Sequence, residues 1–462
     1  MKKISAIVLL LFAYSYPALA QHDMKSMPGM HQSHMTDTAT GNEMGNMDMG
    51  DTGTSGGGHM KMEGMNSGQS LNLPMNRDGS GTSWLPDAAP VFGYMMHVRR
   101  WMLMFHGDVF VRYNRQDLAN AGTRGADKWD APDMLMFMGQ TKTGEKGLFR
   151  FSTMFSTDAL IAGGSGYPLL FQTGESWHGP PLVDRQHPHD LFSELSVSYA
   201  YALSRKADVS VYVGYPGEPA LGPVTFMHRP SGSFMPDAPI GHHWADATHI
   251  TFGVGTLGLR FGKLKLEGSS FTGREPDENR YDFDKPLFDS WSGRLSYNPS
   301  AYWALQASHG FIKSPEALHP GEDVNRTTAS ATYVYPINAN NYIAATLLWG
   351  QNATPGKDAS NSVLAEATAR LGKSAIYTRY EWVQKSGEEL NLSPVLYSLD
   401  TQYPVNEITV GAGRDLRTFG HIVVASGAQI TIYHTDAALG NLYGSNPLAA
   451  EVYMHVYPTR MK

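Results

Sequence analysis

From about residue 91 onward the sequence alternates between short extended segments and turns, and no stretch sustains the 3.6-residue period of an amphipathic helix. About sixteen segments rich in Tyr, Trp, Phe, Val and Thr are predicted as strands, each close to the ~9–11 residues of a tilted membrane strand. Their expected limits are 101–114, 133–143, 147–157, 190–203, 207–215, 248–261, 263–273, 289–297, 300–312, 325–336, 339–350, 361–371, 374–386, 405–415, 421–435 and 450–458. Tight turns and long connectors alternate between them, which is typical of an antiparallel transmembrane β-barrel with short periplasmic turns and long outer loops.

The hairpin at Gly372-Lys373 illustrates how the two faces of these strands should differ. A two-residue turn places Glu366 opposite Arg379, and both belong to a face of charged and polar residues. The opposite face is apolar or uncharged: Val363, Ala365, Ala367, Ala369, Leu371, Ile376, Thr378, Tyr380 and Trp382. Lipid outside and a polar lumen inside require this arrangement. A bulge is also expected near Thr256 in the segment 248–261. One of the tight turns is expected around Arg417.

Residues 1–20 have the pattern of a secretory signal peptide. Lys2 and Lys3 precede an apolar run, and Ala18-Leu19-Ala20 forms a small-residue cleavage site, so cleavage is expected after Ala20. The chain has no cysteine, which excludes disulfides and thiolate chemistry. A net charge of −7 and the lack of a long basic run argue against nucleic acid as a partner. These features favour an exported protein in the outer membrane of a Gram-negative bacterium.

Residues 21–66 combine methionine and histidine with Gly, Ser, Thr, Asp and Asn, so they lack the apolar surface needed for a core and are expected to be disordered. Ten of the 24 methionines lie between Met24 and Met65. The candidate ligands are Met24, Met27, Met30, His31, His34, Met35, Met44, Met47, Met49, His59, Met60, Met62 and Met65. Thioether sulfur prefers Cu(I), which predicts copper or another soft metal here. The alternative is a compositionally biased spacer. Residues 67–90 are expected to link this segment to the barrel at 91–462.

Two of the long connectors concentrate the remaining histidines. One contains His187-Pro188-His189, and the other contains His242-His243. Both should lie at the same rim of the barrel, where neutral imidazoles could bind copper, zinc or another transition metal. In the alternative interpretation these rings form a latch, hydrogen-bonded to Asp184, Asp190 or Asp246.

Enzyme motifs are weak, and no enzymatic activity is expected. Ser308 and His309 are adjacent in a predicted strand, so their side chains should point to opposite faces. The acidic pair formed by Glu366 and Glu381 is better explained as charge pairing with Arg379 in the lumen than as a glycosidase site.

The signal peptide, Met/His-rich segment, linker and barrel together resemble the architecture of the copper-resistance outer-membrane proteins of the B type. The chain from Thr82 to its end also resembles a family of uncharacterised exported proteins from metal-rich bacterial gene neighbourhoods. That second resemblance is carried by segments at 83–87, 101–107, 166–170, 184–190, 216–223 and 273–277.

The Met/His composition and the first resemblance imply a barrel that handles copper or a related ion, captured by the Met/His segment and exported or sequestered through the barrel. The second resemblance implies no particular activity. The expected partners are outer-membrane lipid, the barrel assembly machinery, metal ions and periplasmic metal carriers. The alternative function is a non-transporting surface or periplasmic β-protein with a binding or structural role.

Overall fold

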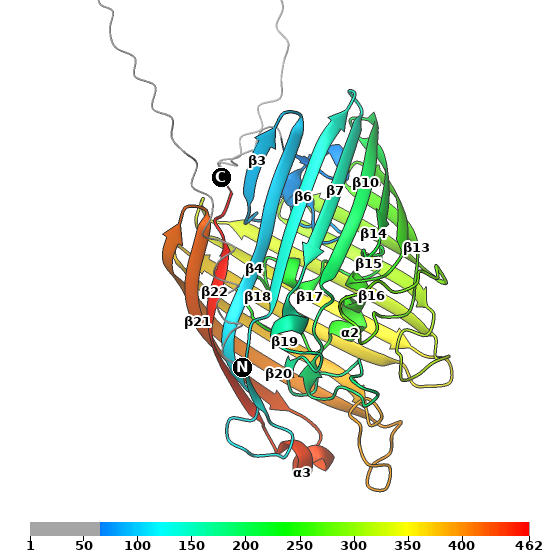
Figure 1. Cartoon of the computed structure of the whole chain (residues 1–462), viewed down its shortest axis with the longest axis vertical. Helices are drawn as coiled ribbons and strands as arrows, with labels where there is room; N and C mark the ends of the chain where they lie inside the picture. Colours follow the sequence, from blue (N-terminus) through cyan, green and yellow to red (C-terminus); the bar gives the residue numbers. More distant parts are fainter. Residues whose placement is uncertain (1–64, 462) are drawn as a thin grey trace, which may run out of the picture. The chain divides into compact units, whose positions relative to one another are not determined.

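A computed structural model describes residues 65–461, in which sixteen antiparallel strands close into a barrel (Figure 1). The predicted fold class is therefore confirmed. The strands are β4 (Trp101–Arg115), β6 (Asp133–Thr143), β7 (Gly147–Phe155), β10 (Phe192–Ser204), β11 (Ala207–Gly214), β12 (Val254–Phe261), β13 (Leu264–Phe271), β14 (Ser290–Ser300), β15 (Trp303–Ile312), β16 (Val324–Pro336), β17 (Tyr342–Ala353), β18 (Ser360–Leu371), β19 (Ser374–Ser386), β20 (Gln402–Phe419), β21 (Ile422–His434) and β22 (Leu448–Pro458). The expected signal peptide and the Met/His-rich segment up to Gly64 lie outside the described residues.

Closure of the barrel depends on β4, which pairs with both β6 and β22. Two short strands complete its free edges: β3 (Tyr94–Val98) pairs with the first residues of β4, and β5 (Asp127–Asp130) pairs with the last. Short turns join the strands at one end of the barrel, and long loops join them at the other. Below, these are the turn end and the loop end.

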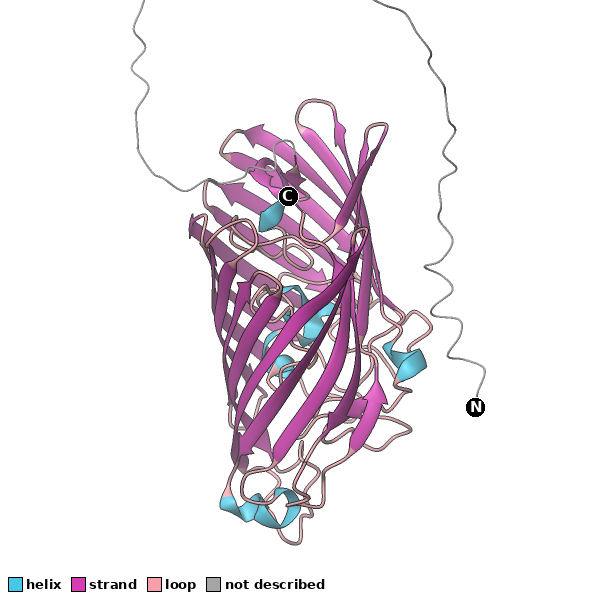
Figure 2. Cartoon of the chain, turned by 90° about the vertical axis from the view of Figure 1, so that its left-hand side faces the viewer, coloured by secondary structure: helices cyan, strands magenta, loops and turns pink. Residues whose placement is uncertain are grey.

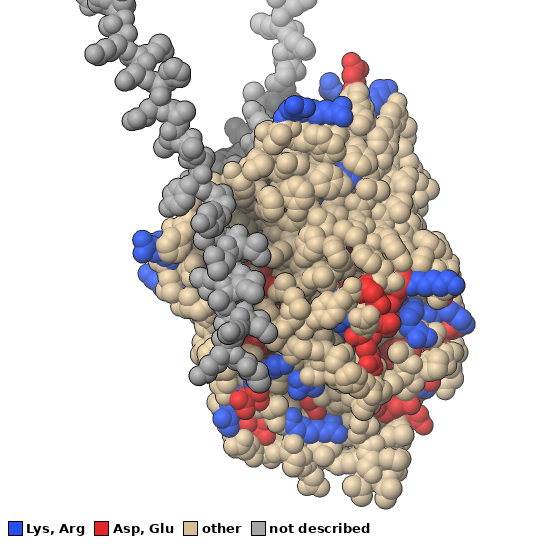
Figure 3. Space-filling model, in the orientation of Figure 1, with Lys and Arg blue, Asp and Glu red and all other residues tan. Residues whose placement is uncertain are grey.

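Side chains alternate between the lumen and the outer surface along each strand. In β13, Lys265 and Glu267 are buried in the lumen, whereas Leu264 and Leu266 are 44% and 59% exposed on the outside. Figure 3 shows a broad surface without charged residues between charged groups at the two ends. Because a bilayer solvates such an apolar band and a closed barrel leaves no strand edge unpaired, the chain is a transmembrane barrel of the outer-membrane type.

The hairpin between β18 and β19 has the predicted register. Leu371 faces Ser374 across the turn, and Glu366 lies opposite Arg379. Both charged residues are 2% exposed, whereas Ile376 on the other face is 53% exposed. The prediction of a polar lumen face and an apolar outer face is confirmed here.

Two local predictions are wrong. The strand expected at 248–261 begins only at Val254 and keeps a continuous register with both neighbours, so it has no bulge at Thr256. The apparent change of phase arises because Thr248 belongs to a short inward-folded helix, η3 (Ala247–His249). The turn expected around Arg417 lies instead at Gly420, whose positive φ of 58° suits a tight turn, and the bulge in β20 falls between Asp415 and Arg417.

The segment 67–90, expected as a linker, folds into the lumen at the turn end. It contains β2 (Ser70–Pro74), which pairs with β1 (Asn66–Ser67), and the short helix η1 (Met75–Arg77). Charged groups of the barrel wall hold it: Ser70 bonds to Asp208, Asp78 pairs with Arg150 at 2.6 Å, and Thr82 accepts from Lys265 and Arg294. Its Gly, Ser and Pro content suggests a linker, but the lumen supplies partners for its polar groups.

The β11–β12 loop (residues 215–253) also folds inward and crosses the lumen with its helix α2 (His242–Ala245) (Figure 1). Figure 2 shows short helices inside the barrel near mid-height. Two buried ion pairs and a pair of hydrogen bonds fix the loop to three different strands. Arg229 pairs with Glu366 of β18 at 2.7 Å, Asp237 pairs with Arg112 of β4, and the backbone N–H groups of Ile240 and Gly241 donate to Glu381 of β19.

The remaining elements are short and lie in the loops. They are α1 (Asp158–Ile161), β8 (Tyr167–Pro168), β9 (Arg185–Gln186), η2 (Phe226–His228), η4 (Ala437–Leu439) and α3 (Gly440–Tyr443). Between residues 65 and 461, no helix has the length and apolar character needed to cross a membrane.

Candidate metal centre

Five histidines from two loops gather in the lumen, and we call them the histidine cluster. His187 and His189 belong to the β7–β10 loop (residues 156–191), and His242, His243 and His249 belong to the β11–β12 loop. The ring centroids of neighbouring histidines are 5.6 Å apart for His187 and His243, 5.4 Å for His189 and His249, and 5.1 Å for His242 and His249. The prediction that the two loops meet is confirmed.

Local structure turns these rings toward one another. Pro188 separates His187 from His189, while α2 and η3 place His242 and His249 on successive short turns. Gly174 packs directly against the ring of His243, where a Cβ would lie 2.3 Å from a ring carbon. All five histidines are 8% exposed or less, so the cluster is shielded from solvent.

Oxygen atoms hold one nitrogen of each ring. The Nδ1 of His189 lies 2.8 Å from Asp158 Oδ2, and the Nδ1 of His242 lies 2.6 Å from Asp246 Oδ1. The Nδ1 of His249 is 2.9 Å from the backbone oxygen of Asp246. In the other two rings, His243 Nδ1 lies 3.4 Å from Glu275 and His187 Nε2 lies 3.2 Å from Glu175.

The Nε2 atoms of His189, His242, His243 and His249 are buried and have no hydrogen-bond partner among the described residues. Histidines that bind metals commonly donate their second nitrogen to a carboxylate or carbonyl, which fixes the tautomer and leaves the other nitrogen as a ligand. Four rings of the cluster have this arrangement.

Burial also keeps several of these rings neutral. It lowers the pKa of His187 and His249 well below the usual value, with neighbouring histidines adding to the effect. The pKa of His242 is lowered by burial as well, although Asp246 opposes the shift. Neutral imidazole is the form that binds a metal ion.

The rings are not yet spaced as they would be around an ion. Within residues 65–461, the only three acidic or histidine side chains with ligand atoms all within 4.8 Å of one another are Asp277, Asp282 and Asp284. These lie in the β13–β14 loop, and two of them are exposed. Binding at the histidine cluster would therefore require at least one ring to move inward.

The latch interpretation holds for only one of its three carboxylates. Asp246 bonds to His242, but Asp184 bonds to Arg124 and Tyr443, and Asp190 pairs with Arg280. The carboxylates beside His189, His187 and His243 are Asp158, Glu175 and Glu275, respectively, none of which was predicted. The sequence analysis missed these three carboxylates and assigned His249 to a strand. No local sequence signal points to the carboxylates, because the folded course of the loops brings them next to the rings.

A small cavity and a larger acidic cavity adjoin the cluster. The small cavity has about 280 Å³ of empty space and is lined by His187, His189, His243 and His249. The acidic cavity, with about 1160 Å³, lies among the loops between β15 and β20 and is lined by Glu316, His319, Glu322, Asp358, Glu388, Glu389 and Asp400. Asn352 lines it and donates to the backbone oxygen of His243 at 3.0 Å, which places the acidic cavity beside the cluster.

Ser308 and His309 point to opposite faces of β15, as predicted. Ser308 is 5% exposed and accepts from the backbone N–H of Gly222 at 2.8 Å. His309 is exposed and bonds to Thr327. The two side chains are therefore on opposite sides of the barrel wall and cannot act together as a nucleophile and its base.

Comparisons with solved structures return porins of low sequence identity. Salmonella typhi OmpF, solved with daunomycin, is 11% identical, with 79% of this chain and 100% of that chain covered and a TM-score of 0.48. An anion-selective porin from Comamonas acidovorans is 11% identical, with 78% and 99% covered and a TM-score of 0.46. Pseudomonas aeruginosa OpdQ is 10% identical, with 79% and 99% covered and a TM-score of 0.37. No protein-family model matches the chain, and no curated protein matches it. The barrel is therefore established by its own strand pairing, and its function has to be inferred from its own residues.

Proposed function

We propose that this outer-membrane barrel handles a transition metal and binds a divalent ion at the histidine cluster in its lumen. The observation that carries the proposal is the set of four buried Nε2 atoms without partners on rings whose other nitrogens are held by oxygen. Leaving one such polar atom unsatisfied costs about 1–3 kcal/mol, so four in one place require an explanation. A bound ion would satisfy several of them at once.

The surroundings support a divalent ion of the zinc, copper or nickel type. Neutral imidazole suits these metals, and the acidic cavity beside the cluster would concentrate cations at the loop end. The carboxylates of Glu175 and Glu275 add negative charge next to His187 and His243. The Met/His-rich segment at 21–66 would capture ions on the other side of the membrane.

Titration of the detergent-solubilised full-length protein with Zn(II) tests the histidine cluster. His189→Asn should weaken Zn(II) binding at least about tenfold, because losing a ligand should cost no less than losing its supporting carboxylate. His309→Asn is the matched control, since His309 is exposed and bonds only to Thr327. Equal Zn(II) affinity in the wild type and in His189→Asn would refute the proposal and leave the cavity as a water-filled space.

Deletion of the Met/His-rich segment should separate capture from folding. The deletion should cover residues 22–63, because the backbone oxygen of Met65 accepts from the Met75 N–H and that of Asn66 accepts from the side-chain amide of Gln140. The truncated protein should bind at least two fewer Cu(I) ions and still migrate as a heat-modifiable band on unheated SDS gels. Unchanged Cu(I) stoichiometry would contradict the role given to the segment.

A further inference from the structure

Methionines line one wall of the lumen. Seven buried ones form a single cluster, and four that are partly buried pack against it. The buried members are Met75, Met102, Met104, Met134, Met136, Met138 and Met154, and the partly buried ones are Met65, Met95, Met227 and Met461. We call this set the methionine wall. On the other strands of the barrel, β10 to β22, no buried inward-facing position is methionine.

The distribution of methionine between the two faces argues against simple packing. On β4, β6 and β7, six lumen-facing positions are methionine, whereas no outward-facing position of these three strands is. The outward apolar positions of the same strands carry residues such as Leu103, Phe105 and Phe137. If burial were the only requirement, leucine, valine or phenylalanine would serve equally well inside. On these three strands the sequence places sulfur on the lumen side alone.

Strand register sets the sulfur-bearing side chains in adjacent rows. Met104 lies directly opposite Met95 on one side and Met138 on the other. In the next row, Met136 lies between His106 and Met154. Directly opposed residues have Cβ atoms about 4.5–5.5 Å apart, within reach of two thioethers that share one ion. Successive rows are about 7 Å apart along the strands.

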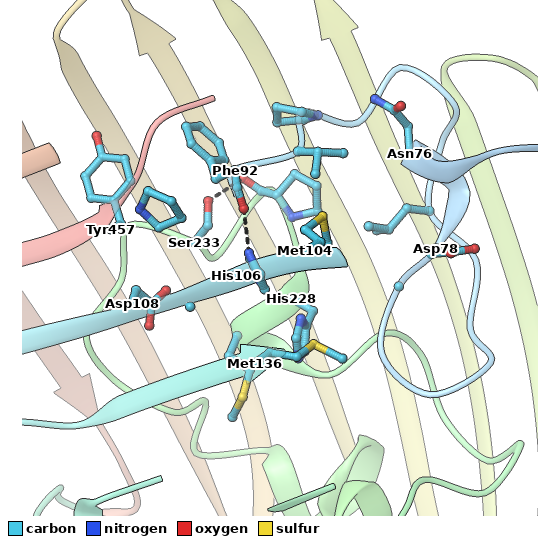
Figure 4. A pocket seen from close by; sticks show the side chains of 18 of the residues that line it. Asn76, Asp78, Phe92, Met104, His106, Asp108, Met136, His228, Ser233 and Tyr457 are labelled. Atoms are coloured by element: carbon cyan, nitrogen blue, oxygen red, sulfur yellow. Dashed lines mark hydrogen bonds between the residues drawn. The ribbon is translucent and has the colours of Figure 1, made fainter. Parts of the chain in front are cut away.

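The wall borders a partly open cavity with about 930 Å³ of empty space, which Met75, Met104, Met136, Met138 and Met227 help to line. Figure 4 shows Met104, His106, Met136 and His228 gathered at this cavity. Three histidines also line it: His106, His228 and His455. The Nε2 of His455 is buried without a hydrogen-bond partner, and the nearest carboxylate, Asp108, is 3.9 Å away.

The methionine wall adjoins Met65 at one end and the histidine cluster at the other. At the turn end, Met65 packs against it and is also the last methionine of the Met/His-rich segment. Toward the loop end, one cavity is lined by both Met134 and His189, and another by Met154 and His249. Met227 lines both of these cavities and the larger one, so the methionine wall and the histidine cluster adjoin.

We propose that the methionine wall is a second metal site, which binds a soft monovalent ion, Cu(I) or Ag(I), through thioether and imidazole ligands. Thioethers are uncharged and polarisable, so they favour a monovalent d10 ion over a divalent one. The inference rests on the proposed function, because it assumes that this lumen handles a metal ion. It adds that monovalent ions bind at the methionine wall, whereas divalent ions bind at the histidine cluster. Ions of the soft class would pass between Met65 and the histidine cluster along this wall.

Silver ions test the site, because Ag(I) needs no reductant. The full-length protein, labelled with 13C at the methionine methyl groups, is titrated with silver nitrate in chloride-free detergent solution and followed by NMR. The test variant is Met104→Leu/Met136→Leu/Met138→Leu, which keeps apolar volume and removes sulfur. Met454→Leu is the control, since Met454 is 39% exposed on the outer face of β22.

The wild type and Met454→Leu should bind at least one more Ag(I) than the triple variant, with shifts in the methyl signals that the triple variant lacks. Zn(II) affinity should be the same in all three, which keeps this test separate from that of the histidine cluster. Equal Ag(I) stoichiometry, with shifts confined to methionines retained in the triple variant, would overturn the proposal and make the wall a packing surface. If the triple variant does not give a heat-modifiable band, Met104→Leu and Met138→Leu are measured singly, and each must weaken Ag(I) binding.

Discussion

Asp246→Asn is expected to weaken Zn(II) binding by about 10–100-fold, the usual cost of losing a carboxylate that orients a metal-binding histidine. Asp246 accepts from His242 Nδ1 at 2.6 Å, from Arg229 Nη1 at 2.9 Å and from the backbone N–H of Phe226 at 3.0 Å. Burial alone would raise the pKa of Asp246, but His242 and Arg229 lower it below its usual value, so this carboxylate is ionised at neutral pH. The asparagine amide keeps the shape of the Asp246 carboxylate but carries no charge.

The same substitution should also lower the free energy of unfolding by about 3 kcal/mol, because Arg229 is left buried with part of its countercharge removed. Zn(II) titration and urea unfolding of the detergent-solubilised protein measure the two effects. Asp158→Asn is the informative comparison, since Asp158 holds His189 and leaves the Arg229 pairs intact, so affinity should fall without a similar loss of stability. Asp436→Asn, at an exposed helix cap, is the control. Unchanged Zn(II) affinity in Asp246→Asn would contradict a role for His242 as a ligand.

The strands could be predicted from the sequence because the signals that specify them are local. Alternation of apolar and polar residues identifies each strand, and a two-residue turn fixes its register, which is why Glu366 was correctly placed opposite Arg379. The errors occur where a neighbouring segment overrides the local pattern. Thr248 reads as the start of a strand, but the inward course of the β11–β12 loop places it in η3.

The candidate sites could be predicted only in part, because their partners are far apart in sequence. His187, His189, His242 and His243 were predicted as ligands from the sequence, but their partners were not: Asp158 lies 31 residues before His189 in the same loop, and Glu275, the partner of His243, comes from the β13–β14 loop. The methionine wall cannot be recognised from one strand, because β4 supplies only Met102 and Met104 to it. Its chemical meaning depends on β6 and β7 presenting the same residue type beside it, which the order of strands in the barrel determines.

Both proposed sites depend on how firmly the β11–β12 loop is held, because this loop supplies His242, His243 and His249 to the histidine cluster and Met227 and His228 to the cavity beside the methionine wall. Its attachments are ion pairs with the barrel wall, chiefly Arg229 with Glu366 and Asp237 with Arg112. Buried ion pairs add little net stability compared with apolar packing, but they are costly to break on one side. They therefore fix the position of the loop more than they strengthen the barrel.

Arg112→Met is accordingly expected to lower the free energy of unfolding by about 3–5 kcal/mol. Arg112 is fully buried and pairs with Asp130 at 2.6 Å, with Glu451 at 2.8 Å and with Asp237. Methionine fills similar space but leaves three buried carboxyl groups without a cation. Urea unfolding, followed by tryptophan fluorescence, measures the loss, and Arg414→Met is the control because Arg414 is exposed and bonds only weakly to Ser374.

The pH dependence of the variant gives a second measure of the same effect. In the wild type, burial would raise the pKa of Asp237, but the Arg112 charge lowers it below its usual value. Without Arg112, burial and the neighbouring carboxyl groups should raise this pKa above that of the unfolded chain. A group with a raised pKa in the folded state loses its stabilising contribution as the pH rises. Arg112→Met should therefore gain more stability than the wild type when the pH is lowered from 7 toward about 5, because Asp237 adds to the gain from loop carboxyl groups such as Asp190 and Glu218, whose pKa burial raises to about 8 in both proteins. If Arg112→Met unfolds at the wild-type urea concentration at both pH values, Arg112 does not hold the loop, and other contacts must position the histidine cluster and the Met227 side of the methionine wall.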